Sequence, residues 1–193
     1  MAPKTSIFSA AFARHNDVVA RSMQQILPDI EKAGVLLIAA LRQGRKVLAC
    51  GNGGSAADSS HFVEELIGRY KNNRRPLPAI ALTGDNVVLT VISNDFGYDQ
   101  VFARQVEALG KKGDILVAFS TSGKSPNVVN AMAAARRKKM QVIALTGENG
   151  EGMRKISDIA VVVPTTETAR IQEVHEITYH SWCEAIDAAL FKV

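Results

Sequence analysis

Four polar side chains that could carry out chemistry recur at helical spacing between residues 58 and 69. Asp58, His61, Glu65 and Arg69 are three, four and four residues apart, so we expect them on one face of a helix. An imidazole and a carboxylate one turn apart can share a divalent metal ion, or the carboxylate can act as a general base. A solvated helix face is the alternative. The position of this pair, one turn into a helix that begins at a predicted ligand site, favours a functional role.

A second polar row lies in the last predicted helix, at about residues 166–190. Gln172, Glu176 and His180 follow one another at intervals of four residues, and His175 adds another imidazole. These histidines suggest a metal-binding or acid–base role, whereas the alternative for each is an ordinary hydrogen-bonded surface residue. The sequence alone does not place this helix beside His61.

A glycine-rich loop precedes the first of these helices. Residues Gly51–Ser55 follow the predicted strand Lys46–Cys50, and a helical pattern opens at Ala56. Free backbone N–H groups at such a helix start favour an anion or a polyol. A dinucleotide site is disfavoured because the acidic residue expected after the second strand is absent, Asp85 coming too late. A tight turn without a ligand is the remaining alternative.

A serine-rich loop follows another predicted strand, Asp114–Phe119. The segment Ser120–Ser125 supplies four hydroxyl groups, a glycine and a lysine, and Ser125 before Pro126 is typical of a helix start. Together with the positive end of the helix dipole, these groups predict a phosphate site. Ala118 occupies the position where a nucleotide-binding P-loop needs glycine, so ATP is disfavoured. A serine-capped turn without a ligand is the alternative.

The elements that must position these loops read as one α/β domain. Two predicted helices, 6–26 and 28–41, come first, and short apolar runs then alternate with helical patterns. The predicted strands are Lys46–Cys50, Ala79–Leu82, Asp114–Phe119, Gln141–Leu145 and Asp158–Val163. We therefore expect a doubly wound, five-stranded parallel sheet flanked by helices. Within the single domain 1–193, residues 1–43 would serve oligomerisation and residues 44–193 would form the ligand-binding core.

Composition limits the possible environments and partners. The 193 residues include 47% hydrophobic and 22% charged residues, enough for one buried core. Cys50 and Cys183 lie far apart in apolar sequence, which favours a reducing, cytoplasmic compartment. We expect no export signal and no membrane span, since the longest apolar run is Val35–Leu41. The formal net charge is +4, but the basic residues are scattered, so we do not expect nucleic-acid binding.

These motifs together resemble the sugar isomerase (SIS) domain family and, within it, the phosphoheptose isomerases. The resemblance covers nearly the whole chain. It is carried by Gly51-Asn52-Gly53-Gly54-Ser55, by His61-Phe62-Val63-Glu64-Glu65-Leu66 with Gly68-Arg69-Tyr70, by Asn94-Asp95-Phe96-Gly97, by Ser120-Thr121-Ser122-Gly123 with Ser125, and by Arg170-Ile171-Gln172-Glu173 with His180.

The resemblance implies a flavodoxin-like sheet, a homotetramer with active sites at subunit interfaces, and one zinc ion per subunit. The implied zinc ligands are His61, Glu65, Gln172 and His180, with Glu65 as catalytic base and His180 as acid. The implied substrate contacts are Asn52, Gly53, Gly54, Ser55, Glu65, Arg69, Asn94, Asp95, Ser120, Thr121, Ser122, Ser125 and Gln172.

The activity implied is conversion of sedoheptulose 7-phosphate to D-glycero-D-manno-heptose 7-phosphate through an enediol, the first step toward the heptose precursors of lipopolysaccharide. One departure supports an alternative. Residues 77–90 look like a non-catalytic SIS protein that associates with the bacterial replication initiator. That relative lacks the equivalents of Glu65 and His180, whereas this chain has both, so we favour the isomerase.

Overall fold

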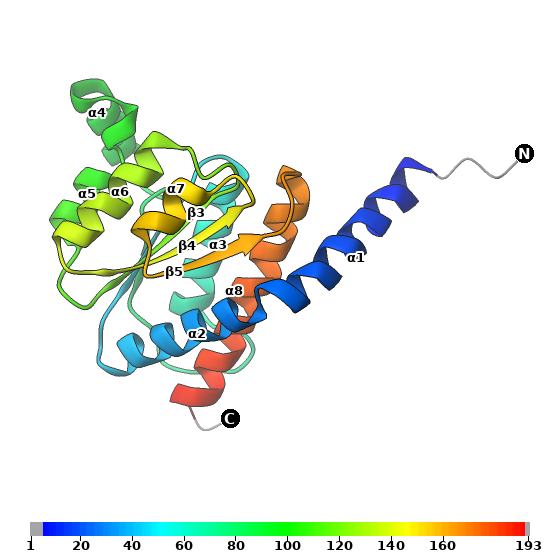
Figure 1. The fold of residues 1–193 in the computed structure, drawn as a ribbon. Coiled ribbons are helices and arrows are strands. Elements are labelled where there is room, and N and C mark those ends of the chain that lie inside the picture. Colours follow the sequence, from blue (N-terminus) through cyan, green and yellow to red (C-terminus); the bar gives the residue numbers. More distant parts are fainter. Residues whose placement is uncertain (1–5, 192–193) are drawn as a thin grey trace, which may run out of the picture.

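The computed structural model describes residues 6–191 as a central parallel sheet with helices on both faces (Figure 1). The strands are β1 (Val47–Cys50), β2 (Ala79–Ala81), β3 (Ile115–Ser120), β4 (Gln141–Gly147) and β5 (Ile159–Val163). The helices are α1 (Ile7–Gln25), α2 (Leu27–Arg42), α3 (Gly54–Ile67), α4 (Asn86–Phe96), α5 (Ala103–Leu109), α6 (Pro126–Arg137), α7 (Glu151–Ile156) and α8 (Thr168–Leu190), with a 3-10 turn, η1 (Tyr98–Gln100).

The sheet has the strand order β2-β1-β3-β4-β5, and every neighbouring pair is parallel. The expected five-stranded, doubly wound fold is therefore confirmed, although the strand ends differ slightly; β3 begins and ends one residue later than predicted. The chain leaves β1 toward β2 on one side, whereas β3 lies on the other side of β1. Such a reversal of strand order opens a crevice at the carboxyl ends of the strands. The loops after β1 and β3 both emerge there.

Alternate strand residues face two separate cores. Val47 and Ala49 point to the core formed with α2, α3 and α8, whereas Leu48 and Cys50 point to the core formed with α5, α6 and α7. Both faces are covered, which explains why the strands read as continuous apolar runs in the sequence. Cys50 and Cys183 are buried free thiols, as expected of small core residues.

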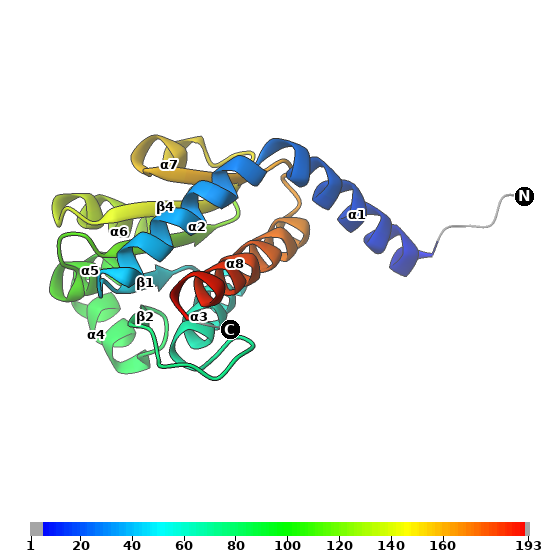
Figure 2. The same ribbon diagram turned by 90° about the horizontal axis from the view of Figure 1, so that it is seen from below.

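Helix α8 packs directly against both α2 and α3 (Figure 2). Trp182 donates its indole N–H to the carbonyl of Ile30 at 2.8 Å, and a Cβ on Gly34 would lie only 3.3 Å from the Trp182 ring. On the other side, the Phe62 ring of α3 contacts Tyr179 and Trp182 at centroid distances of 5.9 Å. This packing sets the polar rows of α3 and α8 opposite one another.

Helix α1 projects away from the body of the molecule (Figures 1 and 2). Its contacts with α8 include the Arg170 guanidinium, which donates to the Ala11 carbonyl at 2.9 Å, and His15, whose Nδ1 lies 2.7 Å from a Glu173 oxygen. Beyond these contacts Phe8 and Phe12 are 81% and 74% exposed. Among the helices of residues 6–191, none combines the length and the apolarity that a membrane crossing requires.

Candidate active site

The glycine loop after β1 depends on a backbone that only glycine tolerates well. Gly53 has φ 55° and ψ −122°, outside the favoured regions of residues with a side chain. A Cβ on Gly54 would collide with the Gln172 amide, so this side chain of α8 rests directly on the loop. Helix α3 begins at Gly54, two residues earlier than predicted, and its N-terminus faces the crevice.

The serine loop after β3 also depends on a glycine with positive φ and on a close backbone contact. Gly123 has φ 65°, and a Cβ there would collide with the backbone of Gly150. Helix α6 begins at Pro126 with Ser125 as its N-cap residue, as predicted. The Ser125 hydroxyl makes no capping bond, however, and lies 3.0 Å from the Ser120 hydroxyl. The two hydroxyls therefore lie side by side, and a phosphate could accept hydrogen bonds from both.

The two loops are tied together by a pair of amides. Asn52 donates to Asn127 Oδ1 at 2.9 Å, and Asn127 donates back to Asn52 Oδ1 at 2.9 Å. The Tyr98 hydroxyl donates to the same Asn52 oxygen at 3.2 Å. Asn127 is only 2% exposed, so this reciprocal pair holds Asn52 in one orientation.

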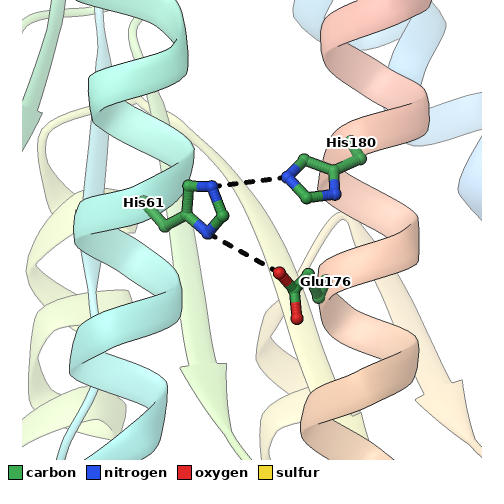
Figure 3. Close-up of side chains that lie close together, drawn as sticks. All are labelled: His61, Glu176 and His180. Carbon is green, nitrogen blue, oxygen red and sulfur yellow. Dashed lines mark hydrogen bonds and ion pairs between the residues drawn. The ribbon is translucent and has the colours of Figure 1, made fainter. Parts of the chain in front are cut away.

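Helices α3 and α8 bring three of the predicted chemical groups together. His61 Nε2 lies 3.4 Å from His180 Nε2 and 3.5 Å from Glu65 Oε1, and the last two atoms are 4.0 Å apart. Figure 3 shows the two imidazoles pointing toward each other across the gap between the helices. The Glu65 side chain is 14% exposed, whereas those of His61 and His180 are 37% and 29% exposed, so the carboxylate is the most shielded member of the cluster.

The spacing of these three atoms suits a tetrahedral metal ion. Two atoms bound about 2.0–2.1 Å from a tetrahedral zinc ion lie about 3.3–3.5 Å apart. The two distances from His61 Nε2 match this value, and the donors are the imidazole and carboxylate groups that zinc accepts. Ligand-capable groups around His61 also include the carboxylates of Glu64 and Glu176. The residues present therefore fit a metal ion.

Buried acidic groups border the cluster. Burial, reinforced by the negative charge of Glu176, raises the pKa of Asp58 to about 6, while His61 acts in the opposite direction. Burial also raises the pKa of the Tyr179 phenol well above its usual range. Tyr179 therefore remains a neutral phenol, and its oxygen lies 2.9 Å from His61 Nδ1.

The remaining predicted residues are distributed more widely. Arg69 is not on the α3 face with His61, because α3 ends at Ile67 and the Gly68 N–H closes it on the Glu64 carbonyl. That part of the expected polar stripe is wrong. Asn94 and Asp95 are exposed on α4, which lies apart from α8 in both ribbon views. The described chain thus does not bring them to the histidines by itself.

Sequence reasoning missed two residues that contact the predicted site. Tyr179 faces His61 from α8, and Asn127 fixes Asn52. Glu176, the middle member of the predicted row between Gln172 and His180, also faces His61, whereas Tyr179 gave no signal because it reads as an apolar position. Asn127 reads as an ordinary residue in the first turn of a helix.

Comparisons with known proteins agree with this geometry. The SIS domain family model matches residues 12–147. The phosphoheptose isomerase of Aliarcobacter butzleri is 50% identical over 179 residues, which cover 93% of this chain and 95% of that protein. The corresponding protein of Thiobacillus denitrificans is 53% identical, with 87% of both chains covered.

Solved structures lead to the same group. The phosphoheptose isomerase of Neisseria gonorrhoeae has a TM-score of 0.89 and 42% identity, covering 94% of this chain and 97% of that one. The Francisella tularensis structure has a TM-score of 0.91 and 38% identity, with 94% and 96% covered. Fold, motifs and overall identity therefore agree, and the chain belongs to the phosphoheptose isomerases of the SIS domain family.

Proposed function

We propose that this chain converts sedoheptulose 7-phosphate to D-glycero-D-manno-heptose 7-phosphate. The observation that carries the proposal is the convergence of Glu65, His61 and His180 from two helices beside the crevice. Moving a carbonyl between C2 and C1 requires a base that removes a proton from the adjacent carbon and an acid that protonates the resulting enediolate. A carboxylate and an imidazole about 4 Å apart supply both functions in one place.

In this proposal Glu65 is the base and His180 the acid, each in a state in which its reacting atom is not bound to the metal, because a metal-bound carboxylate is a weaker base and a metal-bound ring nitrogen carries no proton. Glu65 is partly buried, which keeps its carboxylate away from competing water. The His180 ring is held against Tyr70 at a centroid distance of 5.6 Å and against Tyr179 at 4.9 Å. Two aromatic neighbours restrict its rotation, so the ring nitrogen stays directed at the Glu65 side of the cluster.

Zinc is the metal we propose for the cluster, one ion per subunit. His61, Glu65, Gln172 and His180 would hold it, and the spacing of the first, second and fourth supports this set. When bound, zinc would polarise the substrate carbonyl and align the neighbouring oxygens. Gln172 would join the set from its position against Gly54, at the edge of the glycine loop.

The two loops would bind the remainder of the substrate. The hydroxyls of Ser120 and Ser125 and the α6 N-terminus favour the phosphate, and the glycine loop favours the sugar hydroxyls. The complete proposed set of substrate contacts is Asn52, Gly53, Gly54, Ser55, Glu65, Arg69, Asn94, Asp95, Ser120, Thr121, Ser122, Ser125 and Gln172. Because α4 lies apart from α8, we assign Asn94 and Asp95 to the site of a neighbouring subunit.

Assembly into a homotetramer completes the proposal. Residues 1–43 would form the interface, and the 81% and 74% exposed side chains of Phe8 and Phe12 support this role. Light scattering of the purified protein should give the mass of four chains, and a stable monomer at micromolar concentration would contradict it. We place the reaction in the cytoplasm, at the start of heptose synthesis for lipopolysaccharide.

The direct test is to incubate the purified protein with sedoheptulose 7-phosphate in deuterated water. We expect an aldose heptose 7-phosphate that carries deuterium at the carbon that was reprotonated. A chelator should reduce turnover, and added zinc should restore it. Absence of both turnover and exchange, with zinc supplied, together with binding to a replication initiator, would replace the isomerase by the initiator-associating alternative.

A further inference from the structure

The two nitrogens of His61 face different partners. Nε2 faces His180 and Glu65 at 3.4 Å and 3.5 Å. Nδ1 faces the other way and lies 2.9 Å from the Tyr179 hydroxyl oxygen. It also lies 3.8 Å from Glu176 Oε1, the pair drawn in Figure 3. Nε2 therefore faces the cluster with Glu65 and His180, and Nδ1 faces the side-chain oxygens of Tyr179 and Glu176 on α8.

We propose that Tyr179 is a positioning residue that holds the His61 ring with Nε2 directed at the metal site, and that Glu176 assists it. This inference rests on the proposed metal site. Metal-binding histidines generally need a hydrogen-bond partner on the nitrogen that does not bind the metal, because that partner selects the tautomer and fixes the ring plane.

Tyr179 is held rigidly enough for this role. It is 1% exposed, and its ring contacts Phe62, Phe119 and His180 at centroid distances of 5.9, 6.3 and 4.9 Å. A buried aromatic ring with packing on several sides has few rotamers to explore. Its oxygen is consequently a fixed point against which the His61 ring is oriented.

Glu176 favours one of the two neutral tautomers of His61. A tyrosine hydroxyl can donate or accept, whereas an ionised carboxylate only accepts. Glu176 therefore favours the tautomer that carries hydrogen on Nδ1, which donates to the Tyr179 oxygen and leaves the Nε2 lone pair free. A free lone pair on Nε2 is what a metal ligand requires. Since the Glu176 side chain is 49% exposed, we expect its influence to be weaker than that of Tyr179.

The test compares zinc affinities by competition with a chelator in the purified, full-length protein. Tyr179→Phe removes one oxygen and keeps the packed ring, and it should weaken zinc binding about 10- to 100-fold. Glu176→Gln should weaken it less. Tyr70→Phe is the matched control: it keeps the ring that packs on His180 and removes only a phenol oxygen, which has no hydrogen bond within residues 6–191. It should leave zinc affinity unchanged.

A second measurement protects the test against a variant that folds poorly. Long-range proton–nitrogen NMR of the zinc-loaded wild type should show His61 with hydrogen on Nδ1 and metal on Nε2. Metal on Nδ1, or Tyr179→Phe with wild-type zinc affinity, would overturn the inference while leaving the metal site intact. Failure of the wild-type protein to bind zinc would instead overturn the proposed metal site, and this inference with it.

Discussion

The helix cluster of His61, Glu65 and His180 and the two loops at the crevice achieve precision by different means. The cluster consists of long side chains on two packed helices, and residues 119 positions apart in sequence meet at 3.4 Å. The loops rely on backbone shape, with positive φ at Gly53 and Gly123 and short hydroxyl side chains turned inward. Substitutions in the cluster should therefore act mainly through the chemical groups they remove, and substitutions of the loop glycines mainly through the backbone geometry they disturb.

The frame around the cluster does not use the cluster's own side chains, so we expect these side chains to be substituted without unfolding. Arg74 donates to the carbonyls of Glu65 and Leu66 at 2.7 and 2.8 Å, which closes the end of α3. The same guanidinium pairs with Asp187 of α8 at 2.8 Å, and both side chains are nearly fully buried. This clamp uses backbone carbonyls, so it does not depend on the reactive groups.

The largest effect should follow from loss of the base or the acid. Glu65→Gln keeps the size of the side chain but cannot accept a proton from carbon, so turnover should fall about 10²- to 10⁴-fold. His180→Gln should do the same and also weaken zinc binding. Steady-state kinetics and equilibrium binding of the sugar phosphate provide the measurements, and binding should persist.

The double variant sharpens this prediction. Because groups that act as one unit do not contribute additively, Glu65→Gln combined with His180→Gln should be little slower than either alone. If the fold-reductions in turnover of the two single variants instead multiplied in the double variant, the two residues would act independently, in different steps of the reaction.

Backbone shape in the serine loop is tested by Gly123→Ala. The left-handed φ and the collision with Gly150 should together cost about 2–4 kcal/mol of unfolding free energy. Gly44→Ala is the matched control, because φ there is 71° but no heavy atom of the described chain lies within 4 Å of the added Cβ. Urea unfolding should give only about 1 kcal/mol for Gly44→Ala. Equal losses of unfolding free energy at both positions would show that the contact with Gly150 does not contribute.

Hydroxyl groups of the same loop should affect binding rather than stability. Ser120→Ala or Thr121→Ala each removes a hydrogen bond to a charged phosphate, worth about 1.5–3 kcal/mol, or roughly tenfold to a hundredfold in affinity. Calorimetric titration with the sugar phosphate measures this change. Unchanged affinity in both variants would show that the phosphate binds in another part of the crevice.

The smallest expected effect concerns His175, the buried neighbour of the cluster on α8. Burial lowers the pKa of His175 to about 3, from an ordinary value of 6.5. Between these values the unfolded chain binds a proton that the folded chain does not, so stability falls as the pH falls from about 6.5 toward 3. A single proton contributes at most about 1.4 kcal/mol per pH unit.

Replacing that imidazole isolates its contribution. His175→Leu should lose about 1 kcal/mol less unfolding free energy than the wild type when the pH is lowered from 6 to 5. Denaturant titrations of both proteins at both pH values give these free energies. Equal losses in the wild type and in His175→Leu would show that folding does not lower the pKa of His175.

Local pattern was sufficient to predict most of the fold. The alternation of apolar runs with helical spacing indicated five strands in a doubly wound sheet, and the serine before Pro126 located the start of α6. Both signals depend on residues close in sequence, whose side chains point to a common face because of the helical or strand repeat. Element ends were predicted less well. Helix α3 ends at Ile67, before Arg69, because the backbone of Gly68, with ψ −106°, leaves the helical region.

The sequence by itself determined which residues could do chemistry and, apart from Arg69, on which element each lies. Only the tertiary structure decided which of them meet. Packing of α3 and α8 on the same sheet face brings His61 to His180 and Tyr179, whereas Asn94 and Asp95 remain on α4, apart from α8. The physical reason is that these contacts depend on how helices dock over a shared core, and residue spacing along the chain carries no information about that docking.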